Sequence, residues 1–261
     1  MALFLLDSGV WLKKGNPLIS VQETTLGLIT TTKNQTLLIF SLMLFVLVTS
    51  VTVANNYGIP TAILHETSQK FGEPAKKRVI SWQELIQNNQ GNSEWRIINA
   101  VNTFFNQVHF ISDQKHWGIE DYWATPLELL STNGGDCEDF SIAKYFTLLE
   151  LGIPDKRLRI MYVKAVKLNQ AHMVLTYYET PNSEPLILDN LINRIKSASQ
   201  RPDLMPIYSF NGSNLWMSKE RGQGRKVQGG SQRINLWRDL NIRMQQERNL
   251  GYSHTIKSMS K

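Results

Sequence analysis

The hydrophobic periodicity of this chain changes once, and that change constrains the fold more than any other feature. Between Ser81 and Leu151, the segments outside the loops have apolar residues every three or four positions, which is typical of helices. After Gly152, the apolar segments are short, rich in β-branched and aromatic residues, and separated by turn residues. Helices followed by strands predict an α+β fold, with a mostly antiparallel sheet packed on the helices.

Two segments before the middle of the chain predict helices: "SWQELIQNNQ" and "EWRIINAVNTFFNQVHF". The second has five apolar residues at helical spacing, which predict its buried face: Trp95, Ile98, Val101, Phe105 and Val108. A short helix, "LELLSTN", is expected to end at Gly134-Gly135. Three later segments predict strands: "LRIMYVKAV", "AHMVLTYYE" and "PLILDNL".

The helix with the clearest boundaries extends from Asp136 to Leu151. Asp136 is a good N-cap, and Asp139 stands three residues later, as in a capping box. Gly152 and Pro154 end the helix. This helix therefore begins next to Cys137, the only cysteine of the chain.

An uncharged stretch of 19 residues, Thr36 to Ala54, is long enough to cross a bilayer. Lysines precede it and the next charge is Glu66, so the positive-inside rule places the C-terminal bulk outside the cytoplasm. We expect a periplasmic protein, with residues 36–54 acting either as a signal peptide or as a tether to the inner membrane. A buried core helix is the less favoured alternative.

The net charge of +6 is concentrated at the C-terminal end, where residues 219–261 hold ten Lys or Arg against three acids. Outside the cytoplasm such a tail is not predicted to bind nucleic acid. We divide the chain into an N-terminal extension (1–35, expected in the cytoplasm), the uncharged segment (36–54), a main domain (55–217) and a basic tail (218–261). By default, the tail is expected to be a solvated basic helix.

The residues around Cys137 favour a catalytic role for its thiol over a role in packing. A helix N-terminus stabilises a thiolate, and the preceding glycines allow a sharp turn and close approach of a substrate. A thiolate mechanism also needs a histidine and a group that orients it. We favour His172, at the start of a strand, with Asp189 brought beside it by a hairpin near residues 180–183. On the same face of the sheet, that distance allows a bond from His172 Nδ1–H to the carboxylate. The other histidines are less favoured: His109 and His116, which flank the loop before the helix, and His65 and His254 near the ends.

Each of these residues has an ordinary alternative. A lone cysteine is commonly a small buried hydrophobe. A strand histidine is more often structural, and an aspartate before Asn190 can simply start a turn. The prediction of a catalytic site therefore depends on finding all three residue types in order: Cys on a helix, His on a strand and Asp on the next strand.

Several motifs in order resemble the bacterial transglutaminase-like cysteine proteinases of the LapG type: "DYWATPLELLSTNGGDCEDFSIAKYFTLLELGIP", "QAHMVLTYY", "LDNL" and "RPDLMPIYSFN". The resemblance covers roughly Phe110 to Trp216. It implies a papain/transglutaminase-like α+β fold and a periplasmic enzyme that cleaves a large surface adhesin near its N-terminus, releasing cells from biofilms. It also implies Cys137 as nucleophile, His172 as general base and acid, and Asp189 as the orienting carboxylate.

The resemblance further implies calcium dependence through Asp136 and Glu138, and an inner-membrane cyclic di-GMP receptor of the LapD type as an inhibitory partner. One carboxylate about 6 Å from a thiolate opposes its formation by roughly 3 kcal/mol at an effective dielectric constant near 20. Bound Ca²⁺ would remove that penalty. Asp121, Glu120 and Asp139 are candidates to complete the oxygen shell. Without a metal, these acids would only cap the helix and complement its dipole.

Two other functions use the same residues or the same fold. A transglutaminase would pass the acyl group to an amine instead of water. A non-catalytic scaffold would bind a periplasmic partner through the fold and the basic tail. The intact set of Cys137, His172 and Asp189 favours the peptidase over the scaffold.

Overall fold

The computed structural model describes residues 58–217 and 224–259, so the uncharged segment 36–54 lies outside the described residues. Among the residues described, no helix is long and apolar enough to cross a membrane.

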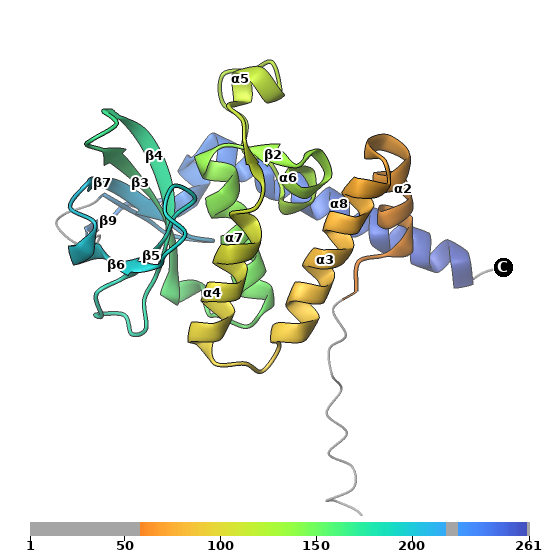
Figure 1. Cartoon of the computed structure of the whole chain (residues 1–261), viewed down its shortest axis with the longest axis horizontal. Coiled ribbons are helices and arrows are strands. Elements are labelled where there is room, and N and C mark those ends of the chain that lie inside the picture. Colours follow the sequence, from red (N-terminus) through yellow and green to blue (C-terminus); the bar gives the residue numbers. More distant parts are fainter. Residues whose placement is uncertain (1–57, 218–223, 260–261) are drawn as a thin grey trace, which may run out of the picture. The chain divides into compact units, whose positions relative to one another are not determined.

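Helices form the first part of the described chain and its end (Figure 1). They are α2 (Thr61–Phe71), α3 (Glu73–Asn89), α4 (Glu94–Phe105), α5 (Asp113–His116), α6 (Pro126–Thr132), α7 (Cys137–Glu150) and α8 (Asn235–Met259). The predicted helices are present, but the second one ends at Phe105, and His109–Phe110 forms a strand instead. The predicted buried face of α4 was also partly wrong, because Trp95 is 58% exposed and Ile97 takes an interior position.

In the described part of the chain, seven strands form one antiparallel sheet in the order β6-β5-β4-β3-β7-β8-β9. The strands are β3 (Leu158–Ala165), β4 (Gln170–Tyr177), β5 (Leu186–Leu188), β6 (Lys196–Ser197), β7 (Leu204–Phe210), β8 (Leu215–Met217) and β9 (Arg225–Lys226). Separately, β1 (His109–Phe110) pairs in parallel with β2 (Gly134–Gly135). The expected antiparallel sheet is therefore confirmed, with four strands that the sequence patterns did not reveal.

Helix α7 lies between the sheet and the other helices, against β3 and β4 on one side and α4 and α6 on the other (Figure 1). It is buried on nearly every face, and it joins side chains of both layers into one core. That core includes Ile98, Val101, Leu129, Ile142, Leu148, Ile160, Leu175 and Phe210. Burial on both sides fixes the position of the helix, and with it the position of Cys137 at its first turn.

The turn before α7 gives the glycine pair a further role that the sequence did not predict. The left-handed residue that ends α6 is Asn133, with φ of 57°. A Cβ on Gly135 would lie 2.4 Å from Asp139 Oδ2, and a Cβ on Gly134 would lie 2.6 Å from Ile111 Cδ1. The glycines therefore make room for neighbouring side chains.

Helix α8 is not a solvated tail, contrary to the default expectation. Trp237 and Leu240 are fully buried in the main core. The Trp237 ring stacks on Phe146 of α7 at 5.5 Å and meets Phe210 of β7 edge-on at 5.2 Å. Trp237 and Leu240 of α8 thus complete the same hydrophobic core as the sheet and α7.

Candidate active site

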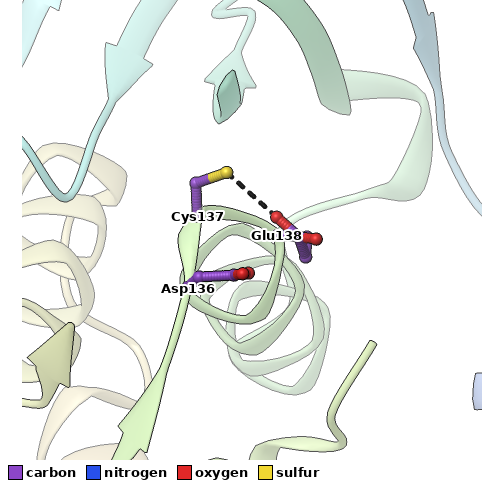
Figure 2. A group of neighbouring side chains, drawn as sticks. All are labelled: Asp136, Cys137 and Glu138. Atoms are coloured by element: carbon purple, nitrogen blue, oxygen red, sulfur yellow. Dashed lines mark hydrogen bonds between the residues drawn. The ribbon is translucent and has the colours of Figure 1, made fainter. Parts of the chain in front are cut away.

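Cys137 is the first residue of α7, and its side chain is partly exposed. Figure 2 shows it projecting from the first turn, with the Glu138 carboxylate turned toward the sulfur. The thiol donates a hydrogen bond to Glu138 Oε2 at 2.9 Å. The backbone N–H of Met173, the residue after His172 in β4, lies close enough to the sulfur to favour its thiolate form.

The surroundings of the thiol favour its protonated form. Burial raises the pKa of Cys137 well above its ordinary value, and the charges of Glu138 and Asp136 raise it further. The Met173 N–H acts in the opposite direction. The expected repulsion between the acids and a thiolate is therefore present, but burial, which the sequence did not reveal, is the larger cause of the raised pKa.

His172 and Asp189 form a buried pair. His172 Nε2 lies 2.8 Å from Asp189 Oδ1, and both side chains are almost fully buried. Leu188 pairs with Leu175, so Asp189 continues the register opposite Val174, two residues from His172 on the same face. The hairpin expectation holds, but the bond uses Nε2 and not Nδ1 as expected, which leaves Nδ1 as the ring nitrogen available to a thiol.

Burial alone would raise the pKa of Asp189. The hydrogen bond and charge of His172, the Leu191 N–H and Arg201 outweigh burial and lower that pKa to about 2. Asp189 is thus a permanent carboxylate at neutral pH, as an orienting group for histidine must be.

The less favoured histidines lie elsewhere. His65 is in α2 and His109 in β1. His116, in α5, packs edge-on against Trp117, and its Nε2 is buried with no hydrogen-bond partner among the described residues. His254 lies in α8, in a part of that helix whose side chains are not described.

Five carboxylates converge beside Cys137. Groups of three whose oxygens lie within 4.8 Å of one another include Asp113–Asp121–Glu138 and Asp113–Asp136–Asp139. All four predicted metal ligands, Asp121, Asp136, Glu138 and Asp139, belong to these groups. Glu120 does not, within the described chain, and Asp113 was missed.

The charges of these acids are only partly compensated. Asp113 Oδ2 accepts from the Tyr122 N–H at 2.5 Å, and Asp139 accepts from the N–H groups of Ala124 at 2.7 Å and Asp136 at 3.1 Å. One oxygen each of Asp113 and Asp136 is buried without a hydrogen-bond partner in the described residues. Burial, followed by mutual repulsion, raises the pKa of Asp113 to about 6 and of Asp136 to about 8.

Buried carboxylate oxygens without donors fit a hard divalent cation, because calcium is bound by oxygen ligands and would neutralise them. Asp113 was hard to find from the sequence because it begins a four-residue helix far from Cys137. The pairing of β1 with β2 brings it to the site. Asp139, whose oxygens are taken by backbone donors, instead ties the loop at Ala124 to the start of α7.

The family model for the bacterial transglutaminase-like cysteine proteinases, BTLCP, matches residues 73–220. The chain belongs to this family. Legionella pneumophila LapG, in a structure described as EGTA-treated, is 43% identical with a TM-score of 0.62. That match covers 70% of this chain and 96% of the Legionella chain. A calcium-bound structure of the same LapG is 42% identical, with a TM-score of 0.61 and coverage of 71% and 99%. No curated protein matches the chain.

Membership in the bacterial transglutaminase-like cysteine proteinases confirms the resemblance stated from the motifs and the papain/transglutaminase-like α+β fold. The chain is a cysteine peptidase of the LapG type. That relative binds calcium, and in this chain the acidic cluster beside Cys137 could hold a metal ion.

Proposed function

We propose that this bacterial transglutaminase-like cysteine proteinase is a calcium-dependent endopeptidase with Cys137 as nucleophile, His172 as general base and acid, and Asp189 as orienting carboxylate. The observation that carries the proposal is the buried bond from His172 to Asp189. His172 directly precedes Met173, whose backbone N–H lies close to the Cys137 sulfur. A single cysteine at the tip of the central helix supports its role as nucleophile.

In this mechanism, His172 Nδ1 takes the thiol proton and the thiolate attacks the peptide carbonyl carbon. The C–N bond then breaks as the imidazolium gives its proton to the leaving amine, leaving a thioester on Cys137. A water molecule, deprotonated by His172, attacks the thioester, and the thiol is restored as the acid product leaves. Backbone N–H groups in the first turn of α7 are the candidates to hold the oxyanion.

Asp113, Asp121, Asp136 and Glu138 would hold the calcium ion. When bound, it would neutralise the carboxylates beside the thiol and hold the loop in place. Glu138 accepts the thiol hydrogen bond in the structure described here, so its recruitment as a ligand would free the thiol for His172. Asp139 keeps a structural role in this scheme.

We extend the proposal to substrate, location and regulation. The substrate is the N-terminal region of a large surface adhesin, and cleavage promotes release from biofilm. The enzyme acts in the periplasm, where an inner-membrane cyclic di-GMP receptor of the LapD type sequesters it. The family and the uncharged segment 36–54 support these statements.

The test incubates the purified full-length chain with an N-terminal adhesin fragment, with calcium and then with EGTA. We expect a cut fragment only with calcium, and none with Cys137→Ala. Mass spectrometry distinguishes the alternatives. An isopeptide cross-link would indicate a transglutaminase. Binding of the fragment without cleavage, by both the wild type and Cys137→Ala, would indicate a scaffold. Equal cleavage in EGTA would exclude the calcium requirement.

A further inference from the structure

The motif "RPDLMPIYSFN" has no role in the proposed mechanism. The side chain of its first residue, Arg201, nevertheless contacts Asp189 of the candidate active site. Arg201 follows a short 3-10 helix, Ala198–Gln200, and its side chain is only 2% exposed. Its Nη2 donates to Asp189 Oδ2 at 2.8 Å. The same guanidinium holds Asp203 with Nη2 at 2.9 Å and Nε at 3.0 Å.

Each oxygen of Asp189 therefore has its own partners. Oδ1 faces His172 Nε2 and accepts the Leu191 N–H at 3.0 Å, whereas Oδ2 is held by Arg201. Donors on both oxygens fix the plane of the carboxylate. Rotation of that plane would break the Arg201 bond and turn Oδ1 away from the imidazole.

Stability is a weak reason to keep such a buried cation, because apolar side chains often replace buried ion pairs at no loss of stability. Arginine has a specific property instead: its planar fork can bond two carboxylates in a fixed geometry, which lysine cannot do. Asp203 is 25% exposed and anchors the fork from the surface side, while Asp189 is fully buried.

We propose that Arg201 is a positioning residue that locks the Asp189 carboxylate so that it fixes the ring orientation of His172 and keeps the His172 proton on Nε2. Arg201 does not act on the thiol or the substrate. Its effect passes through Asp189 to the imidazole, leaving Nδ1 bare for Cys137. The kinetic part of this inference rests on the proposed function, whereas the tautomer part does not.

The first test is independent of any substrate. Ring ¹⁵N NMR of the full-length protein, with the His172 signals assigned by their loss in His172→Gln, reports which nitrogen carries the proton. We expect the Nε2–H form in the wild type and a mixture of tautomers in Arg201→Met. An unchanged His172 signature in a folded Arg201→Met protein would overturn the proposal, even if the adhesin fragment is cut. A changed signature without any cleavage would instead count against the proposed function alone.

The second test uses cleavage of the adhesin fragment. We expect Arg201→Met to lower kcat between about 10- and 100-fold, the range found for residues that orient metal-binding histidines, with KM within about twofold. Arg201→Lys should lose about tenfold, because the ammonium group lacks the rigid planar fork that holds both carboxylates in a fixed geometry. This second variant keeps the test decisive if Arg201→Met fails to fold, since wild-type kcat in Arg201→Lys would contradict the proposal.

The deciding comparison is a double-mutant cycle, measured with enzyme in excess. In an Asp189→Asn background, Arg201→Met should have almost no further effect on kcat. The effect of Arg201 is proposed to pass through the Asp189 carboxylate, which this background lacks. A loss that simply adds to that of Asp189→Asn would mean a general structural role and would overturn the proposal.

Arg157 provides the matched control. It also pairs with a carboxylate, that of Glu94, at 2.5 Å, and it precedes β3 of the same sheet without contacting Asp189. Arg157→Met should alter thermal stability but leave kcat and the His172 signature unchanged. An equal loss of kcat in Arg157→Met would show that removal of any such arginine impairs the enzyme, which contradicts a specific role for Arg201.

Discussion

Cys137 has one acceptor for its proton in the structure and a different one in the proposed mechanism. In the structure the thiol donates to Glu138, while the proposed base is His172, on the strand whose Met173 N–H contacts the sulfur. A carboxylate acceptor one residue away is a local feature of the sequence. The histidine comes from 35 positions later, and tertiary structure alone decides how it approaches the thiol.

Lys144, also on α7, is a buried charge outside the mechanism. It is fully buried, and its Nζ has no hydrogen-bond partner among the described residues. Burial lowers the pKa of Lys144 to about 7, while the charge of Asp189 acts in the opposite direction. The folded state therefore accommodates the ammonium group poorly.

We expect Lys144→Met to raise the free energy of unfolding by about 2 kcal/mol at pH 6, in the range found when apolar residues replace buried ions. The folded pKa is depressed below the unfolded value of about 10.4, so the unfavourable effect of Lys144 is complete below pH 7 and fades as pH rises toward 10. Urea unfolding at several pH values measures this. A variant less stable than wild type at pH 6 would contradict the prediction.

At the scale of elements, α8 is attached at several points to the loop before α6. Arg243 donates to the Trp123 carbonyl and lies over the Tyr122 ring, with its Cζ 4.3 Å from the ring centroid. Glu247 accepts from the Thr125 hydroxyl at 2.6 Å. The same loop contains Asp121 of the acidic cluster, so α8 supports one side of the candidate calcium site.

The contribution of α8 to stability can be measured at Trp237. Replacing this fully buried ring by alanine should lower the free energy of unfolding by about 3–5 kcal/mol, the usual effect for a large core side chain. Trp95→Ala, on the exposed face of α4, is the control and should change it by no more than about 0.5 kcal/mol. Equal effects of the two substitutions would mean that α8 does not belong to the folded core.

For the molecule as a whole, the acidic cluster joins α5, the loop before α6 and the start of α7. A cation bound there stabilises only the folded state. Calcium at 100 times its Kd would add about 2.7 kcal/mol, which corresponds to a rise in Tm of roughly 5–10 °C. Scanning calorimetry with calcium and with EGTA measures this shift.

Asp113→Asn should remove most of that calcium-dependent shift, because it deletes a charge common to two of the ligand groups. Glu120→Gln, in the neighbouring loop but outside those groups, should keep it. A full shift in Asp113→Asn together with its loss in Glu120→Gln would place the ion elsewhere.

Local sequence determined the elements and the kind of chemistry. The capping residues at Asp136 and Asp139, the change of periodicity after Leu151 and the position of Cys137 act over a few residues, so they can be read directly. Tertiary structure decided which distant groups meet: Asp113 with Glu138, Nε2 of His172 with Asp189, and Arg201 behind that carboxylate. It also buried α8, because the weak amphipathic pattern around Trp237 does not specify a partner. Strand register and helix packing arise from the whole core, and no local pattern encodes them.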